Sequence, residues 1–233
     1  RRRLIGSEIP LSGRSADTGD EPVSLSVREI YRRTVNLEEG KERRRWSLVT
    51  SPEDMGPRTF LVETLPPLRE GERITVVPAC VQATYDPALP AGKMNQRWRG
   101  LVGEWRDFLA DELEDLQEPV IRRAWNELIG LGPGSTPAGD DFLSGRASGM
   151  LWQGNAVPFH PVPGRTTWLS EEMLRDALAG GIWFRAKRLL EALASEEPEA
   201  VTKSAGNIAD WGHTSGRAWL AGLAEALCRE RTG

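Results

Sequence analysis

The pattern of apolar and polar positions changes once along the chain, near residue 90. Before that point, short runs of β-branched and aromatic residues alternate with polar ones, and turns rich in proline and glycine separate them. Strand follows strand without a helical period between them, which favours an antiparallel sheet or a small barrel over βαβ units. The small and polar residues at 13–20 predict a flexible loop. The predicted strands include residues 23–27, 46–49, 59–62 and 73–77.

After a linker at residues 86–92, apolar residues recur with a period near 3.6, which predicts helices. One long amphipathic helix should run from Trp98 to Leu116, and a second should begin at Glu118-Pro119 and end at Gly130. The whole chain is therefore expected to be an α+β protein, with a strand-rich domain at 1–90 and a helical domain at 91–233. The remaining predicted helices cover residues 140–150, a segment with Ser170 as its N-cap and a break at Gly180-Gly181, then 184–193, 198–209 and a terminal helix opened by 211–216.

Composition narrows the class of protein. A formal net charge of −4 over 233 residues argues against a dedicated nucleic-acid binder. The arginine runs at 1–3 and 43–45 are short, so a solvated face is the preferred interpretation. No stretch approaches the roughly 18 apolar residues of a membrane span, and the start of the chain, which is not Met, has no signal-peptide core. We expect a cytoplasmic protein, in which Cys80 and Cys228 are free thiols.

One loop has a composition that a simple connector does not need. Residues 131–145 combine glycines, prolines, hydroxyls and two adjacent carboxylates between two helical segments. Such a loop is suited to present backbone N–H groups and hydroxyls to an anion at the start of the next helix. Asp140 and Asp141 add proton acceptors or metal ligands. The plainer alternative is a capped helix start, in which both acids only complement the helix dipole.

A second stretch repeats this arrangement in short form. Residues 139–145 and 216–222 each read glycine, two variable residues, an aromatic residue, leucine, a small residue and glycine. Two helix N-termini presented in this way are expected to face one another across a central site. His213 precedes the second stretch, where it is either a general acid or base or a packed residue at a helix entry.

The residues suggest no cofactor motif. The spacing of histidine and cysteine does not indicate a transition metal. Paired carboxylates can hold Mg²⁺ beside a phosphate, but no metal is assigned on that ground.

At these two loops the sequence resembles a bacterial family long catalogued as a domain of unknown function, which includes the AllH-type subunit of the oxamate carbamoyltransferase of anaerobic allantoin breakdown, a purine catabolic route. The motifs that carry the resemblance are Gly-Leu-Gly-Pro-Gly-Ser-Thr-Pro-Ala-Gly-Asp-Asp-Phe-Leu-Ser-Gly at 130–145 and Gly-His-Thr-Ser-Gly at 212–216. Thr166-Thr167 with Ser170 is a weaker third match. Ser135 and Ala218 depart from the usual family pattern, which has an apolar and an acidic residue there.

The resemblance implies carbamoyl transfer between an oxalurate-like ureido acid and phosphate, with carbamoyl phosphate on one side of the equilibrium. It also implies a small anionic substrate and further subunits of a hetero-oligomeric enzyme as partners. Asp140 or Asp141 would orient or deprotonate a ureido nitrogen, and His213 with Thr214 and Ser215 would contact a second anion. The implied substrate-binding residues are Gly132, Gly134, Ser135, Thr136, Gly139, Thr167, Thr214, Ser215 and Gly216.

Two other interpretations stay open. Residues 136–145 come close to the signature of ribokinase-like small-molecule kinases, but Pro137 replaces a glycine whose N–H such a kinase uses. The chain also fits a non-catalytic subunit whose loops bind a metabolite or shape an interface.

Overall fold

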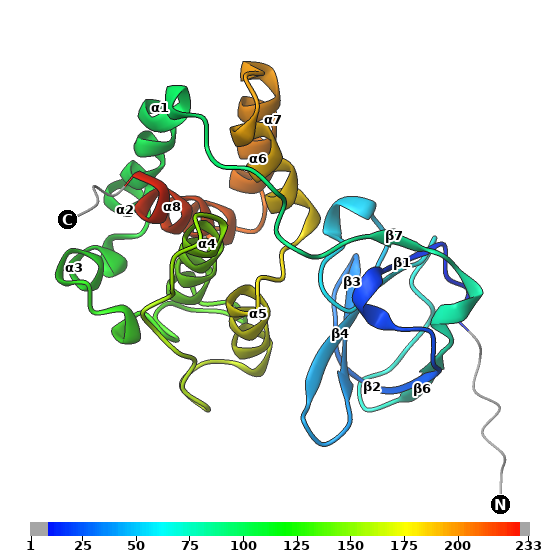
Figure 1. Cartoon of the computed structure of the whole chain (residues 1–233). Helices are drawn as coiled ribbons and strands as arrows, with labels where there is room; N and C mark the ends of the chain where they lie inside the picture. Colours follow the sequence, from blue (N-terminus) through cyan, green and yellow to red (C-terminus); the bar gives the residue numbers. More distant parts are fainter. Residues whose placement is uncertain (1–8, 229–233) are drawn as a thin grey trace, which may run out of the picture. The chain divides into compact units, whose positions relative to one another are not determined.

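The structure is a computed structural model that describes residues 9–228. The chain divides into two compact units, Arg1–Pro87 and Ala88–Gly233. The first unit is built on a sheet and the second on helices (Figure 1), which confirms the predicted α+β class. The arginine run at 1–3 lies outside the described residues. Within the described part, no helix is long and apolar enough to cross a membrane.

The first unit is a curled half-barrel sheet of seven strands in the order β6-β2-β3-β4-β5-β1-β7. Its central strands form an antiparallel meander, in which Leu37 pairs with Val27 on one side and with Trp46 on the other. Two neighbouring pairs, β4 with β5 and β1 with β7, are parallel, so the sheet is mixed. Its strands are β1 Gly13–Ser15, β2 Val23–Ile30, β3 Thr34–Glu39, β4 Arg44–Val49, β5 Thr59–Leu61, β6 Arg73–Val76 and β7 Ala83–Tyr85.

The flexible loop predicted for residues 13–20 is wrong. Its first three residues form β1, and the 3₁₀ turn Ala16–Thr18 follows. The small polar side chains that suggested flexibility make hydrogen bonds instead. Ser15 Oγ donates to the Asp17 carboxylate at 2.8 Å and accepts from the backbone N–H of Thr59 at 2.9 Å. Strands β3 and β7 are additional to those predicted.

The second unit contains eight helices within the described residues, most of them around a central pair (Figure 1). Helix α4 is buried along almost its whole length, and α8 lies beside it with a mainly buried surface. The helices are α1 Arg99–Glu104, α2 Phe108–Asp111, α3 Glu114–Arg122, α4 Ala138–Trp152, α5 Trp168–Leu178, α6 Phe184–Ala194, α7 Pro198–Ala209 and α8 Ser215–Cys228.

The prediction of one continuous helix from Trp98 to Leu116 is wrong, because the segment forms several short helices. The 3₁₀ turn Trp105–Asp107 separates α1 from α2, and Glu112 leaves the helical region at φ −136°. The apolar stripe is buried nonetheless. The bent path keeps α1, the turn and α2 all in contact with α8, so tertiary packing sets the breaks.

Three predicted helix boundaries also differ from the structure. Helix α3 begins at Glu114, so Pro119 lies inside it. It ends at Arg122, with the left-handed Arg123 as its C-cap, well before Gly130. Helix α5 has Thr167 as its N-cap, because the Thr167 hydroxyl accepts from the Ser170 N–H at 3.1 Å. The Ser170 hydroxyl instead donates to the Asp140 carboxylate at 2.8 Å, in the candidate site.

The repeated seven-residue pattern becomes a reciprocal helix crossing. A Cβ at Gly145 would overlap the carbonyl oxygen of Trp219, and a Cβ at Gly222 would overlap that of Phe142. The last glycine of each stretch thus packs against the aromatic residue of the other. Only glycine permits backbones to approach this closely. The crossing fixes α8 against α4 and brings their N-terminal ends to one end of the pair.

Candidate functional site

Three segments that are distant in sequence meet at the start of α4. The Thr136 and Ser215 hydroxyls lie 3.2 Å apart, which joins the first loop to the first residue of α8. The Thr167 hydroxyl donates to the Ser135 carbonyl at 2.5 Å, which joins the N-cap of α5 to the same loop. The two sequence motifs and the weaker third match therefore form one site.

Asp140 holds these segments in place. Its carboxylate is buried, with one oxygen accepting from the Gly130 N–H at 2.9 Å. The other oxygen accepts from the hydroxyls of Ser170, at 2.8 Å, and Thr166. Three of the roughly four acceptor positions of this carboxylate are thus used inside the fold. Asp140 is accordingly placed to position the loop and α5.

Asp141 is in a different environment although it is the next residue. Its side chain is 4% exposed and its Oδ2 atom has no hydrogen-bond partner. Desolvation raises the pKa of Asp141 to about 8; the Ser215 hydroxyl opposes part of this rise, and the charge of Asp140 adds to it. At neutral pH Asp141 is therefore mostly a neutral carboxylic acid, which can donate a proton.

The loop before α4 presents backbone donors. Gly132 and Gly134 have φ values of +114° and +92°, which favour glycine. Within residues 9–228, the N–H groups of Gly134, Ser135 and Thr136 have no hydrogen-bond partner in the protein. Gly134 and Ser135 are exposed and Thr136 is half-buried, so these N–H groups lie at the surface. Successive free amides of this kind form a site for an anion.

Gly139 and Gly216 have a packing role. The Gly139 N–H donates to the Leu131 carbonyl at 2.9 Å, and the Gly216 N–H donates to the Trp211 carbonyl at 3.0 Å. A Cβ at Gly139 would overlap the carbonyl oxygen of Leu128, and one at Gly216 would overlap that of Ile208. Both amides are used inside the fold, so the expectation that these glycines hold an anion is not supported by their geometry.

His213 and Thr214 lie in the turn before α8. Thr214 is half-buried and its carbonyl accepts from the Ala218 N–H at 2.9 Å. His213 is exposed, and its side chain makes no hydrogen bond or ion pair within the described residues. Ser215 is the residue of this segment that reaches the first loop, so the role of His213 as a general acid or base, or as a contact to a second anion, stays a prediction.

The described residues contain no group of three or more histidine, cysteine or acidic residues able to hold a metal ion together. Asp140 is a poor metal ligand in this setting because N–H and O–H donors already surround its oxygens.

The contacts of Thr166 and Ser170 with Asp140 were not expected from the sequence, which predicted Ser170 only as an N-cap. Their signal is the Thr-Thr-x-x-Ser pattern at a helix start after a loop rich in proline and glycine. That pattern predicts an N-cap and gives no information about a carboxylate 26 residues away.

The fold and the site thus define a helical unit built around two loops rich in glycine and hydroxyl groups. Residues 128–227 match the family model described as oxamate carbamoyltransferase subunit AllH. The matched segment runs from just before the first loop to the end of α8, and it confirms the resemblance carried by the motifs. No curated protein and no solved structure matches the chain.

Proposed function

We propose that the helical unit acts in an oxamate carbamoyltransferase-like subunit, which binds a small anionic ureido acid and phosphate, or carbamoyl phosphate, where its two loops meet. The family match supports a subunit of this enzyme at the level of the family. The 3.2 Å contact between the Thr136 and Ser215 hydroxyls is the observation that carries the proposal, because it joins the two motifs.

The loop supplies the contacts for an anion. The free amides of Gly134, Ser135 and Thr136 lie at the surface beside the Thr136 and Ser215 hydroxyls. A charged carboxylate nearby would repel the ligand. The raised pKa of Asp141 removes the contribution of Asp141 to that repulsion at neutral pH, because the protonated acid carries no charge.

In the proposed reaction an oxygen of hydrogen phosphate attacks the ureido carbonyl of oxalurate and forms a tetrahedral intermediate. The C–N bond to the oxamate nitrogen then breaks and the nitrogen takes a proton from Asp141. The proton of the hydrogen phosphate passes to Asp141 and restores the acid, and the products are oxamate and carbamoyl phosphate. Backbone amides stabilise the oxyanion of the intermediate. In the reverse direction the Asp141 carboxylate recovers the proton from the attacking oxamate nitrogen. Asp140 keeps the loop in place throughout.

A non-catalytic, metabolite-binding subunit is the second candidate. Two observations favour it: the matched family is described as a subunit, and His213 makes no contact with Asp141 in the described structure. A ribokinase-like kinase is disfavoured, because all seven strands precede α1 and no helix of the second unit is interleaved with them.

The test measures carbamoyl phosphate and oxamate formed from oxalurate and phosphate by the purified chain, alone and with the other subunits of an oxamate carbamoyltransferase. We expect Asp141→Asn to lower turnover by about 100-fold or more, since the amide cannot supply the proton. Ser204→Ala is the control and should leave turnover unchanged, because Ser204 lies half-buried in α7, outside the two loops. Unchanged turnover in Asp141→Asn would contradict the catalytic proposal and would favour the non-catalytic, metabolite-binding subunit instead.

A further inference from the structure

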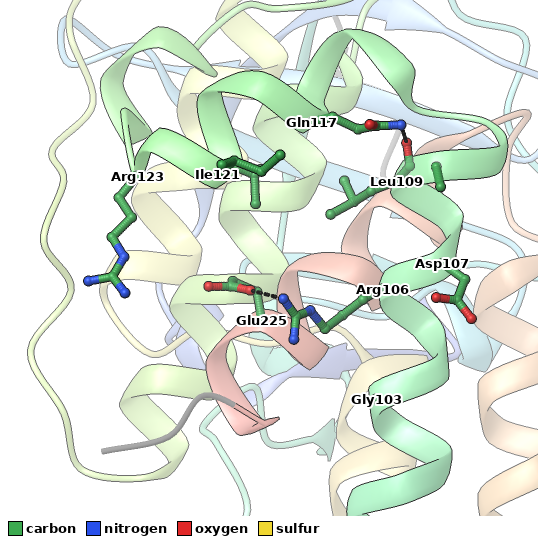
Figure 2. A pocket seen from close by; sticks show the side chains of 10 residues that line it. Gly103, Arg106, Asp107, Leu109, Gln117, Ile121, Arg123 and Glu225 are labelled. Atoms are coloured by element: carbon green, nitrogen blue, oxygen red, sulfur yellow. Dashed lines mark hydrogen bonds and ion pairs between the residues drawn. The ribbon is translucent and has the colours of Figure 1, made fainter. Parts of the chain in front are cut away.

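A separate cavity of about 570 Å³ opens on the helical unit between α1, α2, α3 and α8 (Figure 2). Its size lies in the range of cavities that bind small molecules. Nine of its ten lining residues lie between Gly103 and Arg123, before the segment that matches the AllH family, and only Glu225 lies within that segment. The cavity is therefore not accounted for by the proposed carbamoyl transfer.

Part of the wall is aliphatic. Leu109, Ala110 and Val120 line it, together with Ile121. Ile121 is 77% exposed, which is unusual for a large apolar side chain, and in Figure 2 it points toward the space between Arg123 and Leu109. An apolar group placed there would bury the Ile121 side chain, and the burial of this apolar surface would favour binding.

The charged groups of the cavity leave one guanidinium without a partner. Arg106 pairs with the buried Glu225 at 3.5 Å, so this pair is neutral. The Arg123 guanidinium makes no hydrogen bond or ion pair within the described residues, and the residue is exposed. Its backbone N–H donates to the Val120 carbonyl at 3.1 Å. Asp107 lies at the opposite rim, and in Figure 2 its side chain points away from Arg123. The two arginines and two acids sum to zero charge, which disfavours a dianion.

Arg123 also has an unfavourable backbone conformation. It ends α3 at φ +59° and ψ +31°, the left-handed position where helices usually have glycine. A residue with a side chain is less stable than glycine in this conformation. The guanidinium has no hydrogen bond or ion pair within the described residues, so no interaction of that kind offsets this cost.

We propose that this cavity binds a small monocarboxylate with an aliphatic or aromatic body. The Arg123 guanidinium pairs with the carboxylate through two parallel hydrogen bonds, and the body of the ligand lies against Ile121 and Leu109. A planar guanidinium matches a carboxylate in this way, whereas a phosphate dianion would need a second unpaired cation.

The test is calorimetric titration of the full chain with 4-methylpentanoate and with phenylacetate. We expect saturable binding of at least one of them, and at least 10-fold weaker binding of the neutral 4-methylpentanamide. Arg123→Gly should weaken binding of the carboxylate at least 10-fold without lowering the thermal stability, because glycine favours the left-handed conformation. Ile121→Ser should weaken binding of the carboxylate several-fold.

Arg43→Gly is the matched control, because Arg43 is another left-handed arginine, at φ +57° in the first unit. It should leave the affinity unchanged. The proposal is overturned if neither carboxylate binds or if Arg123→Gly binds like the parent chain. Self-association that Ile121→Ser abolishes, without carboxylate binding, would overturn it too and identify an interface between copies of the chain.

Discussion

Replacing Asp141 by asparagine should stabilise the chain, and the gain should grow as the pH rises. Asp141 is buried with an unpartnered Oδ2 atom, and burial raises its pKa from the ordinary value of 3.8 to about 8. Between these two values the folded chain keeps a proton that the unfolded chain releases. The stability that the protonated acid provides is therefore present in full below about pH 4 and is lost progressively as the pH approaches 8.

The size of the effect follows from the proton difference. One extra proton bound by the folded state lowers the free energy of unfolding by about 1.4 kcal/mol per pH unit. From pH 5 to pH 7 the parent chain should lose about 3 kcal/mol relative to Asp141→Asn, whose side chain does not titrate. Subtracting the two free energies at each pH cancels the contribution of groups common to both chains.

The assay is urea unfolding at pH 5, 6 and 7, followed by tryptophan fluorescence. Eight of the nine tryptophans follow Ala88, and only Trp46 precedes it, so the signal reports mainly on the helical unit. Asp140→Asn provides the contrast, since it replaces a carboxylate that accepts three hydrogen bonds and should destabilise the chain at pH 7 by about 2 kcal/mol. A constant difference between the parent and Asp141→Asn from pH 5 to pH 7 would refute the argument.

Three further outcomes are expected. Gly145→Ala and Gly222→Ala should each destabilise the chain by about 3 kcal/mol in urea unfolding, because the new methyl group overlaps a carbonyl oxygen across the α4–α8 crossing. Gly206→Ala, in α7 with open space around it, should instead stabilise by up to about 1 kcal/mol, and a similar loss there would contradict the packing argument. Phosphate affinity, measured by calorimetry, should fall as the pH rises through about 8, where Asp141 becomes charged; an unchanged affinity at pH 9 would count against Asp141 being near the anion.

The sequence alone predicted the elements that depend on local signals. Helix α7 has the bounds expected from Pro198 and the apolar positions that follow it. The apolar stripe from Trp98 to Leu116 was correctly expected to be buried, but its division into short helices depends on how the chain follows α8. Both cysteines are free thiols, as expected.

In the candidate site too, the features that depend on local sequence were predictable and those that depend on tertiary contacts were not. The loop and its hydroxyl groups stood out by composition, and the structure brings Thr136, Thr167 and Ser215 together. The different roles of Asp140 and Asp141 were not predictable, because they depend on which side chains of α5 and α8 reach each carboxylate. Whether a glycine exposes its N–H or packs against a carbonyl also depends on tertiary contacts, as Gly139 shows.

The most direct test of the two-loop site is a crystal structure of the chain soaked with oxamate and phosphate. The account predicts an anion within hydrogen-bond distance of the Ser135 and Thr136 amides and the Ser215 hydroxyl. Anions bound only elsewhere, with these amides contacting solvent alone at saturating ligand, would contradict it.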